Sequence, residues 1–290
     1  IDLKTLGEAL NPNTGRAAVA DIARELEAIN NPTAPAYTIP AKLLSKGNTN
    51  AKTSKNSLET FILYMSPAAQ NSKGADLCPF RSAGCTAACL YTAGRGKFNN
   101  VQRARMNKSE YFIQDKKTFL AQLALELIAI NKKQLKKGTK AAIRLNGTTD
   151  VDFLYLLKNR AGLDALQLEG LVFYDYTKDP HRVKRYKGTN YTLTFSRAED
   201  NEPQALEILN NSGIVSAVFA EKLPQFYKGF EVIDGDASDD LMIKAAAAAG
   251  VLKRTRKGQG IILGLKAKGD AKKDVSGFVI TSHLNTNENA

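Results

Sequence analysis

The sequence predicts an α/β protein whose strands form a full or partial (β/α) barrel, preceded by an N-terminal helical and loop extension. Two observations predict this class. Short apolar runs alternate with helical patterns, and nearly every run leads directly into a polar cluster. The carboxyl ends of parallel strands meet at one edge of a sheet, so these clusters would gather there. We place the extension at residues 1–40 and one α/β domain, which carries a cysteine loop, at residues 41–290.

The composition indicates a globular protein with an anionic partner. Hydrophobic residues make up 43% of the 290 residues, and no run approaches the roughly 18 apolar residues that span a bilayer. Lys and Arg total 41 against 29 Asp and Glu, so the net charge is +12. This charge favours an anionic small molecule or a nucleic acid as partner. The first ten residues lack the apolar core of a secretory signal, so we expect a cytoplasmic protein without a membrane partner.

The individual elements follow from the spacing of apolar residues. A period near 3.6 predicts helices, and short apolar runs bounded by turn residues predict buried strands. The predicted helices cover residues 17–30, 100–113, 116–134, 151–159, 202–210 and 239–249. The predicted strands cover residues 60–65, 141–145, 171–174, 191–195, 214–219, 231–233 and 260–265. The polar, basic stretch 45–57 predicts either a solvated loop or a loop that orders around a phosphate or a metal.

Two helix ends rest on explicit stop signals. Pro32 follows residues 17–30 and cannot continue a helix. The strongly amphipathic stretch 116–134 runs through lysines into Gly138, and glycine commonly ends a helix because it tolerates a positive φ. These signals fix the C-terminal ends of both helices.

The polar clusters supply the candidate binding and catalytic side chains. Any single cluster is explained equally well as a helix cap or a turn, but about seven at one edge favour a polar mouth. The groups that we expect to bind an anionic ligand are Arg144, Asn146, Lys178, Arg197 and Lys268, together with Arg95 from a Gly-Arg-Gly segment. The groups that we expect to transfer protons are Asp150, Glu199 and Asp234.

Three cysteines lie within twelve residues, just after the first strand of the predicted domain. Cys78, Cys85 and Cys89 are separated by six and then three residues, and their odd number argues against a disulfide framework. Three thiolates can hold a 4Fe–4S cluster and leave one iron open to a ligand. Zinc is an alternative, with His181 or His283 as fourth ligand. The third alternative is three small buried apolar side chains.

The loop after the first strand is where radical S-adenosylmethionine enzymes hold a three-cysteine cluster, so we predict a radical-SAM-like barrel. Their usual cysteine spacing is three then two residues, and this chain departs from it. No glycine-rich segment follows the second predicted strand. The fold therefore allows S-adenosylmethionine as a cofactor, whereas the motif does not support it.

Several motifs, in one order, resemble a family of phage and prophage proteins. They are LCPFRSAGCTAACLYTAGRG, IRLNGTTD, FYDYTKDPHR, LTFSRAEDN, VIDGD and GLKAKG. The family is the mycobacteriophage gene product 88 domain family, and the similarity runs from about residue 40 to about residue 280. The resemblance implies a viral protein of the bacterial host cytoplasm. It also implies that the three cysteines form a matched unit.

The function predicted from these features is that of a phage iron–sulfur protein. A 4Fe–4S cluster at the mouth of the barrel would support redox or radical chemistry on an anionic nucleotide or nucleic acid. The alternative is a non-enzymatic protein that binds nucleic acid or a host protein and has a structural iron–sulfur or zinc centre. Salt-dependent binding to nucleic acid would favour this alternative.

Overall fold

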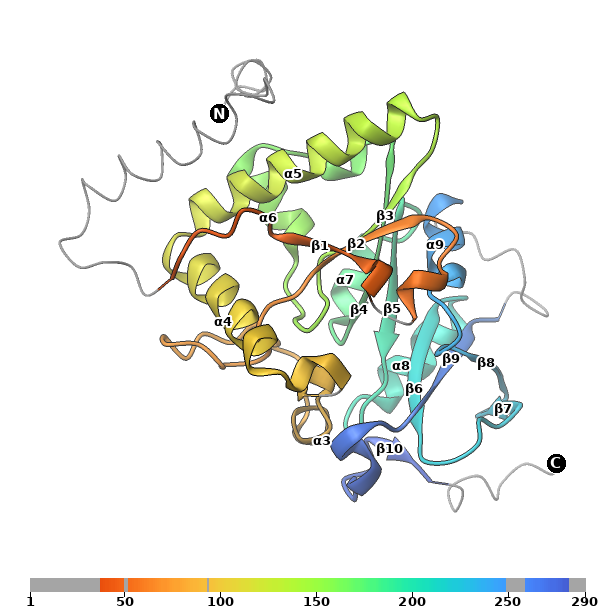
Figure 1. Cartoon of the computed structure of the whole chain (residues 1–290). Helices are drawn as coiled ribbons and strands as arrows, with labels where there is room; N and C mark the ends of the chain where they lie inside the picture. The colour runs from red at the N-terminus through yellow and green to blue at the C-terminus, as the bar shows by residue number, and fades with distance from the viewer. Residues whose placement is uncertain (1–36, 50–51, 93, 249–258, 282–290) are drawn as a thin grey trace.

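The computed structural model describes residues 37–49, 52–92, 94–248 and 259–281. They form a ten-stranded mixed sheet with helices on both faces (Figure 1). The strands are β1 (Leu44–Lys46), β2 (Glu59–Leu63), β3 (Ala141–Arg144), β4 (Leu171–Thr177), β5 (Tyr191–Ser196), β6 (Ile214–Phe219), β7 (Phe226–Tyr227), β8 (Phe230–Asp234), β9 (Ile261–Lys266) and β10 (Val279–Ile280). The helices are α3 (Ala83–Ala87), α4 (Asn99–Gln114), α5 (Lys116–Lys136), α6 (Phe153–Ala161), α7 (Pro180–Arg185), α8 (Glu202–Asn210) and α9 (Asp240–Ala247).

The strand order is β1-β2-β3-β4-β5-β6-β9-β8-β7, with β10 beside β6. All strands from β2 to β8 along this order pair in parallel, so their carboxyl ends share one edge, as predicted. The outermost strands β1 and β7 are antiparallel to their neighbours. Because the described strands form an open sheet, a closed barrel is not confirmed. Short 3₁₀ turns occur at Gly47–Thr49, Thr53–Lys55, Leu90–Thr92, Gly94–Lys97, Ala165–Gln167 and Gly269–Lys273.

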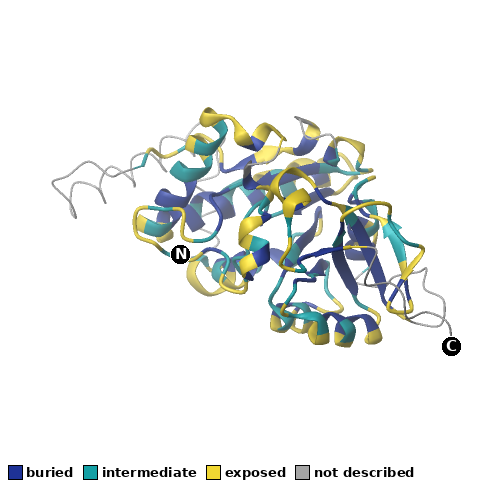
Figure 2. Cartoon of the chain, turned by 90° about the horizontal axis from the view of Figure 1, so that it is seen from below, coloured by how far each residue is buried: buried dark blue, intermediate teal, exposed yellow. Residues whose placement is uncertain are grey.

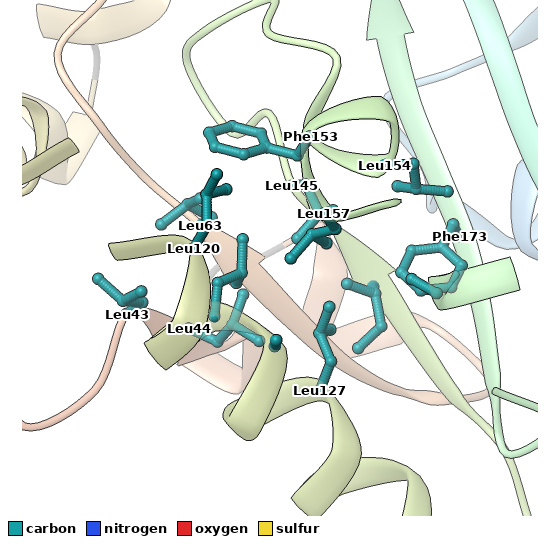
Figure 3. Packing of buried hydrophobic residues seen from close by; sticks show 14 of the residues in the cluster. Leu43, Leu44, Leu63, Leu120, Leu127, Leu145, Phe153, Leu154, Leu157 and Phe173 are labelled. Atoms are coloured by element: carbon teal, nitrogen blue, oxygen red, sulfur yellow. The ribbon is translucent and has the colours of Figure 1, made fainter. Parts of the chain in front are cut away.

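The largest apolar core lies between the outer face of the sheet and the helices α4, α5 and α6. Leu63 and Phe173 from the sheet meet Leu127 from α5 and Leu157 from α6 (Figure 3), and all four side chains are fully buried. Each such side chain contributes roughly 1.5–3 kcal/mol by leaving water. A second cluster continues this layer under α8. In Figure 2 most strands are buried and the helices expose their outer sides, whereas the strands β1 and β8 near the edges of the sheet are partly exposed.

The opposite, inner face of the sheet is covered by α9. Because strand side chains alternate, Ala142 and Val172 point away from the α5 layer and pack against Met242 and Ile243. Toward the carboxyl edge the same alternation places Arg144 on this inner face. The inner face thus changes from apolar beneath α9 to polar at the edge where we expected a ligand.

Most predicted elements are confirmed, several with bounds within one or two residues. The strand expected at 171–174 is too short, because β4 continues to Thr177 and buries Asp175 completely. Within the stretch 45–57, the described residues 45–49 and 52–57 contain the end of β1 and two 3₁₀ turns. Helices α3 and α7 were not predicted, and His181, named above as a possible zinc ligand, lies in α7. The helix expected at 17–30 lies outside the described residues.

Candidate functional site at the carboxyl edge of the sheet

The cysteine segment lies across the carboxyl edge of the sheet. The Cys78 thiol accepts a hydrogen bond from the Ala68 backbone N–H at 3.4 Å and donates to the Thr148 carbonyl oxygen at 3.8 Å. Both partners lie in loops that follow β2 and β3. Cys85 in α3 packs beside Phe278, close to β10. The segment therefore spans from the first parallel strands to the middle of the sheet.

The three thiols share one electrostatic environment. Burial raises the pKa of Cys78 to about 12, and the nearby Asp150, Cys89 and Cys85 act in the same direction. Burial also raises the pKa of Cys89, which Arg105 and Lys178 partly oppose. All three sulfurs are partly exposed and none is in a disulfide. The raised pKa of Cys78 favours its protonated thiol when no metal ion is bound.

The donor chemistry suits a soft metal, but the described residues do not form a finished metal site. Among them, no group of three or more His, Cys, Asp or Glu side chains is placed to hold a metal ion. Cys78 and Cys89 both lie in irregular backbone on either side of α3. Holding a cluster would therefore require these two residues to close on it around Cys85.

Arg105 in α4 is a member of this site that is absent from the predicted ligand groups. Its guanidinium lies 5.0 Å from the ring centroid of Tyr64 and 5.4 Å from that of Tyr91, and it donates to the Tyr91 carbonyl oxygen at 2.9 Å. These contacts hold a positive charge near Cys89. The available signal was the position of Arg105 on the first helix after the cysteines.

Glu199, expected to transfer protons, anchors α3. Its carboxylate accepts hydrogen bonds from the Gly84 N–H at 2.7 Å and the Ser82 hydroxyl at 2.8 Å. Burial favours a raised pKa, but these hydrogen bonds outweigh it and lower the pKa of Glu199. Glu199 thus brings the loop after β5 against the cysteine helix.

Asp150 acts electrostatically on the Cys78 thiol and belongs to a buried ionic junction. It accepts hydrogen bonds from the Lys178 N–H at 2.8 Å and from Arg182 at 2.5 Å. Burial raises its pKa, and Arg182 opposes that shift. Asn146, another predicted ligand group, donates instead to Val151 and Asp175 and stabilises the loop after β3.

Four predicted residues have other contacts. Arg197 is buried, pairs with Glu202 and donates to backbone carbonyl oxygens at the start of β10. Lys268 pairs with Asp236 at 2.7 Å, and Asp234 accepts from the backbone of that same aspartate. Arg95 is exposed on a 3₁₀ turn. None of these contacts joins Arg197, Lys268 or Asp234 to the thiols.

Arg144 and Lys52 form a cationic group on the inner face. The Arg144 guanidinium lies 4.9 Å from the ring centroid of Tyr176, and Lys52 donates to the Tyr176 hydroxyl at 3.0 Å. Lys52 also pairs with the buried Asp239 at 2.5 Å. Sequence reasoning identified Arg144 but not Lys52, which lies in the stretch expected to be a loop.

The fold and this edge define a class of α/β protein in which a three-cysteine segment covers the carboxyl ends of an open, largely parallel sheet. The chain belongs to the Gene product 88 family, whose model matches residues 42–282. This match confirms the phage family resemblance drawn from the motifs. Comparison with curated proteins and with solved structures finds no match. None of the described helices is long and apolar enough to span a membrane.

Proposed function

We propose that Cys78, Cys85 and Cys89 bind a 4Fe–4S cluster that serves redox chemistry on an anionic substrate in the bacterial cytoplasm. The observation that carries this proposal is the gathering of three thiols at the carboxyl edge beside Arg105 and Lys178. Ligands bind at this edge in parallel α/β folds. Three protein thiolates would leave one iron open to a substrate.

The surrounding charges support a thiolate-bound cluster. A thiol binds a metal only after it has lost its proton. The raised pKa of Cys78 makes that loss unfavourable until a metal ion is present. A cluster with three thiolates carries a net negative charge, which Arg105 and Lys178 would stabilise. The nearby Asp150, whose pKa burial raises, is a group able to take up a proton at the site.

The radical-SAM-like form of the proposal adds S-adenosylmethionine at the open iron. The cysteine loop follows β2, the first of the parallel strands, which is the position that such a protein would use. The cysteine spacing does not favour it. Formation of 5′-deoxyadenosine from S-adenosylmethionine in the presence of dithionite would test this form separately.

The first test is analysis of protein purified without oxygen. We expect about four iron and four sulfide per chain and a broad absorption band near 400 nm. Cys85→Ser should lose most of the iron, whereas Ala87→Ser, on an exposed position of the same helix, should retain it. One zinc per chain without colour would overturn the iron–sulfur proposal and make the centre structural.

A second function, nucleic-acid binding, is favoured by the surface of the cysteine segment. Phe80 and Phe98 are 46% and 52% exposed, and the exposed cations Arg95, Lys97 and Arg103 lie close to Phe98 in the chain. Exposed aromatic rings among cations can stack on bases of a single strand. Binding of single-stranded DNA or RNA should weaken steeply with salt and with Phe98→Ala; salt-independent or absent binding would exclude this function.

A further inference from the structure

Arg144 carries a hydrogen-bond donor, its Nε, that the described residues leave unpaired. Its side chain is 17% exposed, and its Nε is buried without a hydrogen-bond partner. Its nearest carboxylate contact is Asp175 at 3.9 Å from Nε, beyond hydrogen-bond distance. A buried donor without a hydrogen-bond partner is costly, and a bound ligand would satisfy the Nε of Arg144.

The carboxylates around Arg144 already have other partners. Asp239 pairs with Lys52 and accepts from the Tyr174 hydroxyl at 3.0 Å. Asp175 accepts hydrogen bonds from two backbone N–H groups, the Asn146 amide and the Tyr191 hydroxyl. Neither carboxylate needs Arg144 for its hydrogen bonds. The Nε donor of Arg144 therefore stays without a hydrogen bond among the described residues.

The surroundings of Arg144 suit one end of a flat or tetrahedral anion. The Tyr176 ring supports the guanidinium, and Lys52 adds a second positive charge on the same ring. Thr194 pairs with Tyr176 in the register of β4 and β5, so both side chains are on the inner face. The Thr194 hydroxyl is buried and has no hydrogen-bond partner among the described residues.

We propose that Arg144 binds an oxyanion, a carboxylate or a phosphate group, through two parallel N–H···O hydrogen bonds at the carboxyl edge. The Tyr176 ring, whose hydroxyl accepts a hydrogen bond from Lys52, holds the guanidinium in place for this contact. The assignment of this oxyanion as part of the substrate rests on the proposed function, but the binding site itself does not. Arg144 is therefore the residue that positions the anionic end of a ligand at the carboxyl end of β3.

The test is calorimetric titration with inorganic phosphate and, separately, with acetate. We expect one saturable site per chain, with the tighter of the two anions identifying the group. Arg144→Lys keeps the charge but removes the paired donors, and it should weaken binding about 10- to 100-fold. Arg160→Lys makes the same change at an exposed position on α6 and should leave binding unchanged.

A second measurement uses the unmodified chain. Phosphate or acetate should protect Arg144 from phenylglyoxal, as followed by peptide mass spectrometry, and leave Arg160 unprotected. Equal affinity of wild type and Arg144→Lys, no binding of either anion, or no protection would each overturn the proposal. The variant with all three cysteines changed to serine should still bind the anion. If wild-type protein contained no iron but still bound the anion, the iron–sulfur proposal would fail and the oxyanion site at Arg144 would stand.

Discussion

Asp150 and Glu199 show how local contacts decide what a carboxyl group can do at one edge of a sheet. Burial acts on both, but Glu199 receives hydrogen bonds from Gly84 and Ser82 and has a lowered pKa. Asp150 has a raised pKa because burial outweighs the attraction of Arg182. Glu199 is therefore a fixed anionic anchor of α3, and Asp150 is the better candidate for proton transfer.

The thiols give a prediction at the same scale. With its pKa raised to about 12, Cys78 in the folded, metal-free protein should react very slowly with iodoacetamide near pH 8. Its rate should rise about tenfold per pH unit through pH 10, whereas a thiol of ordinary pKa levels off above about pH 9. Peptide mass spectrometry after timed quenching measures this rate.

The control for this experiment is the protein unfolded in urea, in which Cys78 should react like a free cysteine. Because only the thiolate attacks the reagent, the folded and unfolded curves should differ most below pH 9. A plateau in the folded protein near pH 9 would contradict the burial argument.

At the scale of elements, α3 is too short to be stable alone, and tertiary contacts determine its position. The Ser82 hydroxyl accepts from the Cys85 N–H at its N-terminus, and Glu199 accepts from Gly84. Gly84 is buried against Phe278 and Glu199, which a larger residue would displace. The helix therefore places Cys85 only while this close packing is maintained.

Gly84→Ala tests this role of α3. The added Cβ would lie 2.7 Å from the Phe278 Cβ and 2.8 Å from Glu199 Oε2, so the helix must shift. We expect a loss of roughly 1–3 kcal/mol in the free energy of unfolding and a reduced iron content. Urea denaturation and metal analysis measure these effects, with Ala87→Ser as the matched change on the exposed side of α3. Full stability and unchanged iron would show that α3 can dock without this packing.

The same elements show what periodicity can predict. The helices α5 and α8 and the strand β6 were predicted because their apolar spacing is regular and their burial is one-sided or complete. By contrast, α3 has no such pattern, since contacts from residues more than a hundred positions away stabilise it. The strand β4 was predicted too short because buried Asp175 resembles a polar loop residue until its partners are known.

For the whole molecule, parallel pairing is what turns scattered polar residues into one edge. The sequence placed Lys178 and Asp150 after different strands, and the structure joins them by a hydrogen bond. The sequence could not show that Lys268 pairs with Asp236 or that Lys52 contacts Tyr176, because those contacts depend on how distant loops fold over the sheet. The sheet edge was therefore predictable, whereas the pairing of individual charges along it was not.

Arg182 links α7 to the loop after β3 and thereby stabilises the whole edge. It is 2% exposed, pairs with Asp150 at 2.5 Å and donates to the Tyr191 hydroxyl at 2.8 Å. The Tyr191 hydroxyl donates in turn to Asp175, whose pKa burial raises to about 6. Removing Arg182 would take away the closest cation to Asp150 and leave Lys178 and Arg144 as the nearby positive charges for Asp150 and Asp175, respectively.

Arg182→Met should therefore lower the free energy of unfolding by about 3–5 kcal/mol at neutral pH. The pKa of Asp175 is raised above its unfolded value of about 4, so its ionisation between about pH 4 and pH 6 disfavours the folded state. Without Arg182 the free-energy cost of ionising Asp175 and Asp150 in the folded state grows. Arg182 acts on both carboxyl groups and is the cation closest to Asp150.

The difference in stability between wild type and Arg182→Met should thus be larger at pH 8 than at pH 5. Urea denaturation at both pH values measures it, with Arg160→Met, at an exposed position, as the control for loss of one positive charge. A difference that is independent of pH would mean that Arg182 stabilises the edge through packing and its bond to Tyr191 rather than by compensating the buried carboxylates.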